Sequence, residues 1–222
     1  MELLEAIKER RSIRGFKPDP VPPEVLRKVL EAAIWSPSAH NSQPWEFFVL
    51  MGNVLEEIKR VNVAKFRSGE PPHPDIGMQS STGPYRERQI ELAKELFRLL
   101  DIPREDKERR RKWAERNIMF YDAPAAIIIG VDESAMGSWT LLDVGIVAQT
   151  ISLAALEYNL GTCIQISVVY YPEEIRRIAR IPDSKKLILG IAIGYPDWDY
   201  PANKLRSRRE PLEKLLTWCG KV

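Results

Sequence analysis

The segment from Ser138 to Leu160 constrains the fold of this chain more than any other. Apolar side chains recur along it at helical spacing and cover more than one face of the helix: Leu141, Leu142, Val144, Ile146, Val147, Ile151, Leu153, Ala154, Ala155 and Leu156. Polar residues interrupt the run, so we expect a buried helix rather than a membrane span. A helix that is apolar all round needs cover on every side, and a second copy of this short chain is an economical source of it. The segment therefore predicts a core helix that also meets a second subunit.

The length, composition and charge of the chain limit the class of protein that it can be. A chain of 222 residues with 44% hydrophobic residues can bury a sizeable core, and we expect a single domain spanning residues 1–222. A net charge of +2 gives no reason to expect a nucleic-acid or membrane partner, and the basic run Arg109–Lys112 has acidic neighbours, as a solvated helix face does. Cys163 and Cys219 lack the spacing of a metal site or a disulfide scaffold. We therefore expect a cytoplasmic protein without a bound metal.

Hydrophobic periodicity divides the chain into helices and strands. Helical spacing covers residues 3–11, 25–35, 54–66, 85–100, 106–116, 138–160 and 172–179. Short apolar runs predict strands at residues 47–50, 125–131, 162–166 and 187–194. The strands are few, they do not alternate with the helices as a doubly wound fold requires, and no GxGxxG motif follows a strand. The predicted fold is α+β, with a mixed, largely antiparallel sheet of four to five strands surrounded by helices.

Residues 67–116 form an excursion from this core. It begins with a proline-rich stretch, Ser68–Pro74, and continues with two helices whose outer faces are heavily charged. Long insertions of this kind are often lids or binding loops, so we expect a possible active-site lid here. The candidates for substrate contacts in and near it are Tyr85, Arg88, Trp113, Arg116, Asn117 and Trp139. The alternative, that the aromatic residues only anchor the excursion and the arginines are solvated, has equal weight.

Ser36–Trp45 is a loop between a predicted helix and a predicted strand. Pro37 and Pro44 bracket it, and the serine, asparagine and glutamine side chains between them offer hydrogen-bonding groups in several directions. Such a loop can hold a flat ligand with polar edges. Taken alone, the same residues also fit an ordinary capped turn.

Two basic segments lie near the ends of the chain. Arg10, Ser12 and Arg14 alternate, so in extended backbone they face one way and form a plausible phosphate clamp. The alternative for Arg10 and Arg11 is a cationic last turn that suits the helix dipole. The second segment, Lys204–Arg209, holds four cations in six residues and by itself indicates a solvated terminus.

Several separated motifs resemble the FMN-dependent nitroreductase family. They are Arg10–Phe16, Ser36–Trp45, Tyr121–Pro124, Leu160–Cys163, Gly194–Pro196 and Arg209–Leu212, in the family's order over nearly the whole chain. The Ser36–Trp45 motif is the most specific of these. The resemblance implies a nitroreductase-like fold, an intertwined homodimer with flavin sites at the subunit interface, and FMN as the cofactor.

The resemblance also implies roles for individual residues. Those expected at the FMN phosphate are Arg10, Arg11, Ser12, Arg14 and Arg209, with Arg206 or else Arg208 or Lys204 as a second basic residue of the tail. Those expected around the flavin ring are Pro37, Ser38, Ala39, His40, Asn41, Gln43, Gln165, Ile166 and Ser167. Because the cofactor carries the chemistry, no side chain is expected to be catalytic. His40 as a general acid was the weaker alternative, since nothing in the sequence places a carboxylate to orient it.

The function that the resemblance implies is reduction of nitroaromatic, quinone or related acceptors. Electrons come from NADH or NADPH, and a ping-pong mechanism passes them through flavin N5. A reductive dehalogenase, an ene reductase or a flavin-fragmenting enzyme on the same fold is the alternative, because each shares these motifs. The sequence leaves the choice between NADH and NADPH open.

Overall fold

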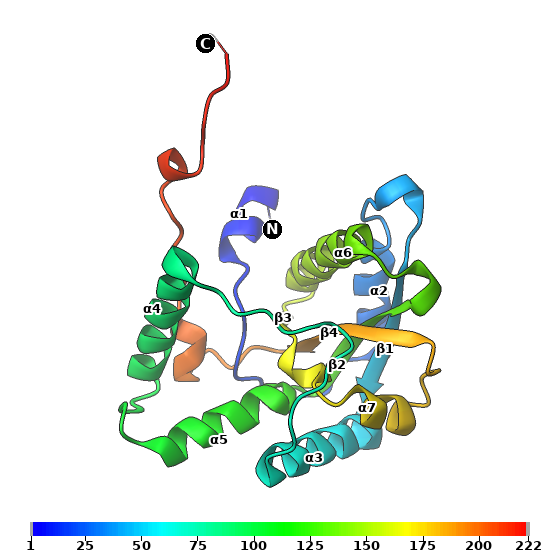
Figure 1. Ribbon diagram of the computed structural model, residues 1–222, viewed down its shortest axis with the longest axis horizontal. Helices are drawn as coiled ribbons and strands as arrows, with labels where there is room; N and C mark the ends of the chain where they lie inside the picture. The colour runs from blue at the N-terminus through cyan, green and yellow to red at the C-terminus, as the bar shows by residue number, and fades with distance from the viewer. Residues whose placement is uncertain (1, 221–222) are drawn as a thin grey trace.

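A four-stranded antiparallel sheet forms the centre of the molecule (Figure 1). The structure is a computed structural model, and it describes residues 2–220. The strands are β1 (Trp45–Met51), β2 (Ala125–Asp132), β3 (Gly161–Gln165) and β4 (Lys185–Gly194), in the spatial order β1-β2-β4-β3. The predicted α+β fold and strand number are confirmed. The parallel component of this sheet is small, a single bridge between Ser12 and Thr162 on the outer edge of β3.

The two central strands are buried on both faces, as their continuous apolar sequences predicted. In β2, Ala125 to Val131 are all buried, and in β4 the same holds from Leu187 to Gly194. Gly190 of β4 lies opposite Gln165 at the end of β3. A Cβ atom on Gly190 would lie 2.5 Å from Val168, so this glycine lets the segment after β3 pack directly on the sheet.

Helices α2 (Pro23–Ala33) and α6 (Ser138–Glu157) cover one face of the sheet. Val29 and Ala33 of α2 and Val147 and Ile151 of α6 pack together there with side chains of the central strands. Pro22 and Pro23 precede and open α2, where the missing N–H of proline costs nothing. This face is one of the two apolar layers of the core.

Helices α3 (Gly52–Ser68) and α7 (Pro172–Ala179), with the short turn η4 (Ser167–Val169), cover the opposite face. Their buried side chains include Leu55, Ile58, Val168 and Ile175. Figure 1 shows α3 and α7 on the side of the sheet away from α2 and α6. The fold is therefore a sheet between two helical layers.

The excursion consists of an irregular stretch, α4 (Gly83–Leu99) and α5 (Lys107–Ile118). Helix α5 packs on the core through Trp113 and Ile118, and Arg67 of α3 forms an ion pair of 2.6 Å with Glu115. Helix α4 is much more exposed, with Leu96 as its buried residue. A left-handed turn, η2 (Phe120–Asp122), then returns the chain to β2.

The two ends of the chain project from this body. Helix α1 (Leu3–Glu9) and the C-terminal tail stand apart from the sheet, and Figure 1 shows the tail leading away from the molecule. The remaining short turns are η1 (Ala39–Asn41), η3 (Glu133–Ala135), η5 (Pro201–Lys204) and η6 (Leu212–Lys214). Large apolar side chains of α1 and the tail are exposed, including Leu3, Leu4, Leu215 and Trp218.

Only one face of α6 is covered within the chain. Val144, Val147, Ile151 and Ala155 are buried at helical spacing, while the opposite face leaves Trp139, Leu142 and Ile146 exposed. By length and composition alone α6 could also cross a membrane, although 44% of its apolar window is buried in the molecule. Core helices commonly share these properties, and the packing of α6 on the sheet and on α2 agrees with the predicted core helix.

Candidate active site

The N-terminal segment places Arg10, Ser12 and Arg14 along the outer edge of β3. Ile13 donates its backbone N–H to Thr162 over 2.9 Å and is itself buried. Its neighbours in sequence therefore point the other way, as their alternation predicted. Burial raises the pKa of the Cys163 thiol, and the charges of Arg14 and Arg10 and the hydroxyl of Ser12 act in the opposite direction. The three predicted clamp residues thus surround one buried side chain.

Asn203 fixes this segment to the start of the tail. Its Oδ1 accepts from the backbone N–H of Arg14 over 2.7 Å, and its Nδ2 donates to Gly15 O and Asp197 O, each over 2.7 Å. Asn203 is buried, so these bonds are shielded from water. Gly15 is required here, because a Cβ would lie 2.4 Å from the ring of Tyr200. Sequence reasoning missed Asn203, since an asparagine before a basic run carries no distinctive signal.

Arg209 reaches the same cluster from the tail. Burial lowers the pKa of Arg10, and the positive charge of Arg209 lowers it further. Arg209 itself donates only to neighbours in its own segment, the Ser207 hydroxyl over 2.7 Å and the carbonyls of Ser207 and Arg208. Neither guanidinium group has a carboxylate among its described partners, and the charge of Arg209 acts on Arg10. Like charges that act on each other in this way favour a bound anion.

The other basic residues of the tail and Arg11 have different surroundings. Arg206 forms an ion pair with Glu9 of α1 and lowers the pKa of that carboxyl by its hydrogen bond. The guanidinium of Arg11 lies 4.6 Å from the ring of Trp198, and its Nε is buried without a hydrogen-bond partner. Lys204 ends η5, and the charge of Arg208 acts on Glu95 of α4. Among these, Arg11 has an unmet donor of the kind that a phosphate oxygen would satisfy.

The loop between α2 and β1 adopts strained backbone. His40, Asn41 and Gln43 all have positive φ, between 46° and 56°, which costs non-glycine residues about 1 kcal/mol or more each. Ser38 accepts from the backbone N–H of Gln43 over 2.9 Å, and the Gln43 side chain donates to Asn41 O and Oδ1. Local polar bonds therefore hold the loop in a shape that its backbone alone would not favour.

Two side chains of helix α6 accept hydrogen bonds from this loop. Asp143 Oδ1 accepts from the backbone N–H of Ala39 over 3.1 Å, and Ser36 donates to Thr150 Oγ1 over 2.7 Å. Asp143 is 5% exposed, which is unusual for a carboxylate. Pro37 and His40 are exposed at the loop surface. Asp143 was another residue that sequence reasoning missed as functional, although an aspartate inside an otherwise apolar helix was a usable signal.

The end of β3 meets the end of α5. The Gln165 side chain donates from Nε2 to Asn117 O over 2.6 Å and to Asn117 Oδ1 over 2.8 Å. Ile166 follows and is 56% exposed, while Ser167 begins η4. The structure thus brings a predicted flavin contact, Gln165, against a predicted substrate contact, Asn117.

The remaining candidates for substrate contacts lie in different environments. Trp113 is buried and packs against Tyr121, with ring centroids 5.3 Å apart, which fits the anchoring alternative. Arg116 pairs with Asp122 over 2.9 Å and lies over the Tyr200 ring. Tyr85 and Trp139 are exposed, and Arg88 lies over the Tyr85 ring and within 3.5 Å of Glu210. These six residues thus differ in exposure and in the partners that they contact.

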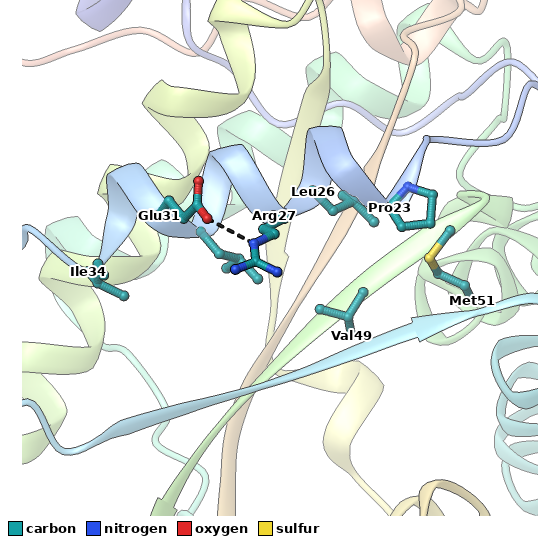
Figure 2. Close-up of a pocket in the computed structure, with 8 residues that line it drawn as sticks. Pro23, Leu26, Arg27, Glu31, Ile34, Val49 and Met51 are labelled. Atoms are coloured by element: carbon teal, nitrogen blue, oxygen red, sulfur yellow. Dashed lines mark hydrogen bonds and ion pairs between the residues drawn. The ribbon is translucent and has the colours of Figure 1, made fainter.

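A separate apolar pocket lies between α2 and β1 (Figure 2). Its volume is about 410 Å³, and it is lined by Pro23, Leu26, Arg27, Leu30, Glu31, Ile34, Val49 and Met51. None of the site residues predicted from sequence lines it. Among residues 2–220 there is also no group of three or more histidine, cysteine, aspartate or glutamate side chains that could hold a metal ion.

The donor set at the edge of β3 fits a phosphate group. Arg10, Ser12, Arg14 and Arg209 supply guanidinium and hydroxyl donors from both ends of the chain, and the buried Nε of Arg11 lacks an acceptor. Guanidinium groups match phosphate oxygens in charge and geometry. The loop at residues 36–43 and the end of β3 add backbone and amide groups suited to a flat, polar ligand. The fold and this site define an α+β protein that binds a phosphate-bearing cofactor.

Comparison with known proteins identifies the family. Residues 7–195 match the model of the nitroreductase family. The nitrobenzene nitroreductase of Ectopseudomonas oleovorans is 32% identical over 218 residues, which cover 96% of this chain and 95% of that protein. The 4-nitrobenzoate reductase of Nocardioides sp. (strain LMS-CY) is also 32% identical, over 98% of this chain and 90% of that protein. The chain belongs to the nitroreductase family.

A solved structure shares the whole architecture. The FMN-dependent nitroreductase NfnB from Mycobacterium smegmatis, solved in complex with NADPH, superposes with a TM-score of 0.92 at 27% identity. The match covers 99% of this chain and 100% of that one. The resemblance inferred from the sequence motifs is therefore confirmed, together with the fold that it implied.

Proposed function

We propose that this protein is an FMN-dependent oxidoreductase that uses NADH or NADPH to reduce nitroaromatic, quinone or related acceptors. The observation that carries the proposal is the convergence of Arg10, Ser12, Arg14 and Arg209 beside β3, without a carboxylate among the described partners of Arg10 and Arg209, in a chain of the nitroreductase family. Relatives named as nitrobenzene and 4-nitrobenzoate reductases support the class of acceptor. The NfnB complex supports FMN and NADPH.

The residues around the cluster contribute to cofactor binding in different ways. Arg10, Arg14 and Arg209 neutralise the phosphate, and Ser12 adds a short hydroxyl donor. Arg11 is oriented by its stacking on Trp198 and offers its buried Nε. Arg206 is held by Glu9, so it acts at longer range than Arg209. Arg208 and Lys204 lie further along the tail and add to the positive field.

The loop at residues 36–43 and the end of β3 border the ring. FMN, when bound, supplies the redox chemistry by taking up electrons from NADH or NADPH and giving them to the acceptor. Ser38, Asn41 and Gln43 present amide and hydroxyl groups from a loop whose shape is already fixed, so little order has to be gained on binding. Pro37, Ala39 and His40 border the ring through the backbone shape of this loop. The segment Gln165, Ile166 and Ser167 borders the other side and positions backbone N–H groups towards the ring.

A homodimer completes the site. Exposed apolar side chains of α1, α6 and the tail form surfaces that one chain leaves uncovered, including Leu4, Leu142 and Trp218. Soluble monomers rarely expose so many large apolar residues. In one copy the loop at residues 36–43 is also open to solvent at His40 and Asn41, as expected if a partner chain covers it.

The free cysteines Cys163 and Cys219 fit a reducing cytoplasm.

The excursion supplies the walls for the acceptor. The compact core provides few side chains beyond those that hold FMN, and α4 and α5 carry Tyr85, Arg88, Arg116 and Asn117 towards solvent or towards the site edge. Arg88 and Arg116 are each paired with one carboxylate, so either can exchange that partner for an acidic acceptor. Trp139 lies at the start of α6 and is open to solvent in one chain, and Trp113 anchors α5.

A visible spectrum and an anaerobic half-reaction test the proposal. The purified protein, reconstituted with FMN if necessary, is expected to be yellow and to bleach on addition of NADH or NADPH without oxygen. Addition of nitrobenzene or 4-nitrobenzoate should then restore the flavin colour with consumption of the acceptor. A protein that binds no flavin after reconstitution would overturn the proposal.

The acceptor that the reduced enzyme uses distinguishes a nitroreductase from the alternative enzymes on the same fold. A protein that is reduced by NAD(P)H but passes electrons to a halogenated aromatic compound and not to nitro compounds would be a reductive dehalogenase. The iodotyrosine deiodinase of Nematostella vectensis is the relevant relative, at 25% identity over 97% of this chain and 74% of that protein. The nitroreductases share more of their sequence with this chain over more of their length, which favours nitro compounds.

A further inference from the structure

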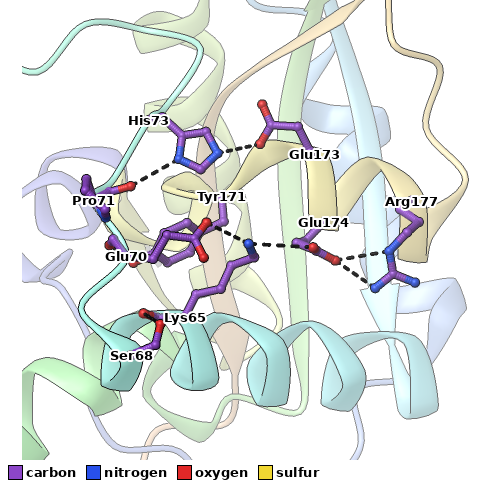
Figure 3. A network of polar contacts seen from close by, with 9 residues as sticks. All are labelled: Lys65, Ser68, Glu70, Pro71, His73, Tyr171, Glu173, Glu174 and Arg177. Carbon is purple, nitrogen blue, oxygen red and sulfur yellow. Dashed lines mark hydrogen bonds and ion pairs between the residues drawn. The ribbon is translucent and has the colours of Figure 1, made fainter.

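Both ends of the excursion are fastened to one short stretch of chain, residues 165–176, which begins at the last residue of β3. At the end of the excursion, Gln165 holds Asn117 through the two hydrogen bonds of 2.6 and 2.8 Å. At its start, the hydroxyl of Tyr171 donates to Glu70 O over 2.9 Å, and the backbone N–H of His73 donates to Tyr170 O over 3.0 Å. Figure 3 shows Glu70, His73 and Tyr171 in this region, with the ion pairs that join Lys65 of α3 to Glu70 and to Glu174 of α7.

A buried ion pair strengthens the attachment at the start. Arg176 of α7 pairs with Asp75, and the same carboxylate accepts from the backbone N–H of Leu187 in β4 over 2.7 Å. Both side chains are at most one-tenth exposed. The start of the excursion is therefore held by a pair that cannot be broken without leaving a buried charge, whereas the contact of its end with residues 165–176 is the uncharged Gln165–Asn117 pair.

The orientation of the two amides at that contact is determined by a backbone group. Asn117 O can only accept a hydrogen bond, so Gln165 must face it with Nε2. The same Nε2 hydrogens then require Asn117 to present its Oδ1. Gln165 Oε1 consequently points away from Asn117, and it is buried without any hydrogen-bond partner. An unpaired buried acceptor destabilises a protein, and an apolar side chain of similar size would avoid that penalty.

A glutamine at this position is thus explained by the two hydrogen bonds that its Nε2 donates to Asn117. Its backbone ends β3, at the place proposed to border the flavin ring, and its side chain holds the last turn of α5. One residue therefore belongs to the cofactor site through its main chain and to the excursion through its side chain. The other residues that attach the excursion to this stretch, Tyr171 and Arg176, lie further from the end of β3 in sequence.

We propose that Gln165 is a positioning residue that couples the excursion to the flavin-facing end of β3. When an acceptor binds and α5 moves, Asn117 transmits the movement to Gln165. The end of β3 in turn limits the positions that α5 can take. This inference rests on the proposed function for the identity of the ligand. The mechanical link between α5 and β3 is independent of it.

Asn62 provides a matched control. It is a second buried amide that supports the same segment, because its Nδ2 donates to Val168 O over 3.0 Å from α3. Its Oδ1 is also buried without a partner. Asn62 therefore matches Gln165 in burial and in chemistry, but it attaches α3 and not the excursion.

The test compares Gln165→Leu, Asn117→Ala and Asn62→Leu by hydrogen exchange of the flavin-free protein. In Gln165→Leu, exchange of the amides of α5 should rise about tenfold, since a local opening becomes easier when a tertiary bond is lost. Asn117→Ala keeps the backbone acceptor and should give a smaller rise in the same helix. Asn62→Leu should leave α5 unchanged. Equal exchange in α5 for Gln165→Leu and Asn62→Leu would overturn the proposal.

A kinetic comparison of the same variants then tests the coupling to the site. In the FMN-loaded enzyme, Gln165→Leu should raise KM for the nitroaromatic acceptor several-fold more than KM for NADH, whereas Asn62→Leu should change both alike. An acceptor KM that stays at the wild-type value while α5 exchanges faster would show that the link is structural only. If the wild-type protein binds no FMN, the proposed function fails, and the exchange result still decides whether Gln165 couples α5 to β3.

Discussion

At the scale of single residues, the site depends on charges that only the folded chain brings together. Arg10 and Arg209 come from opposite ends of the sequence, and the pKa of Arg10 is lowered first by burial and then by the positive charge of Arg209. Such a pair stores repulsion that a bound phosphate relieves. The cluster is thus arranged for its ligand at some cost to the empty protein.

We expect Arg10→Ala and Arg209→Ala each to weaken FMN binding by about 1.5 to 3 kcal/mol, the range for hydrogen bonds to a charged group. This corresponds to about a tenfold to hundredfold rise in Kd, measurable by flavin fluorescence titration. Arg27→Ala is the control, because Arg27 lies exposed on α2 and pairs only with Glu31. Because removal of either cation also relieves the repulsion, the flavin-free variants should unfold at the wild-type temperature or above. Unchanged affinity in both variants would remove the clamp from the site.

Asp143 acts on the loop at residues 36–43 from within α6. Replacing it by alanine leaves the backbone N–H of Ala39 without its acceptor, so we expect a loss of about 1 to 3 kcal/mol in the free energy of unfolding. Asp143→Asn keeps an acceptor oxygen at the same place and should lose less. Urea unfolding of the two variants provides the measurement. Equal losses would mean that the negative charge, and not the bond to the loop, is what the protein needs.

At the scale of elements, the start of the excursion carries a titratable contact. His73 lies between Pro71 O, 3.1 Å from Nδ1, and Glu173, 2.8 Å from Nε2 (Figure 3). The Pro71 carbonyl raises the pKa of His73, and Glu173 raises it further. Only the protonated imidazole donates to both groups at once. Lys65 and Glu70 lie in the same network, joined over 2.7 Å.

The sign of the pH effect follows from the direction of this pKa shift. The contribution of the contact is complete below the ordinary histidine pKa of about 6.5 and is lost as the pH rises through the raised value in the folded protein. We therefore expect exchange of the amides at residues 70–76 to increase, beyond its intrinsic pH dependence, between about pH 6 and 8. His73→Phe keeps a ring against Tyr171 and should abolish this extra dependence. A wild-type profile identical to that of His73→Phe would contradict the assignment.

At the scale of the whole molecule, the apolar face of α6 is where we expect a second copy of the chain to pack. One side of the helix packs on the sheet and on α2, and the other leaves Leu142 and Ile146 in solvent together with α1 and the tail. Burial of a leucine side chain contributes about 1.5 to 3 kcal/mol, so several such residues favour a stable homodimer. The predicted dimer also explains why the cofactor loop is open in one copy.

Leu142→Glu tests the dimer. A charge on the exposed face of α6 should shift the protein towards monomer in sedimentation or light-scattering measurements, and FMN occupancy should fall with the dimer fraction. Val54→Glu is the matched control, since Val54 is an exposed apolar residue of α3 on the other side of the sheet. A wild-type protein that remains monomeric and retains flavin would contradict the assembly and the shared site.

The sequence by itself determined the helices and strands, and it supplied the residues of the candidate site as a prediction. Periods of two and of about 3.6 residues depend on neighbours within one strand or one helical turn, so they predicted the four strands, the seven α-helices and the common direction of Arg10, Ser12 and Arg14. Motifs in the sequence also identified the family, because they record the local backbone that a shared cofactor requires.

Only the tertiary structure decided the strand order and the partners across the fold. Glu9 pairs with Arg206, Asp143 supports the loop at residues 36–43, and Gln165 reaches Asn117, all between residues far apart in the chain. Trp113 proved to be a core anchor for the same reason. Such contacts form when the packed helices and the sheet bring together residues that long stretches of chain separate. No local pattern of residues encodes that geometry.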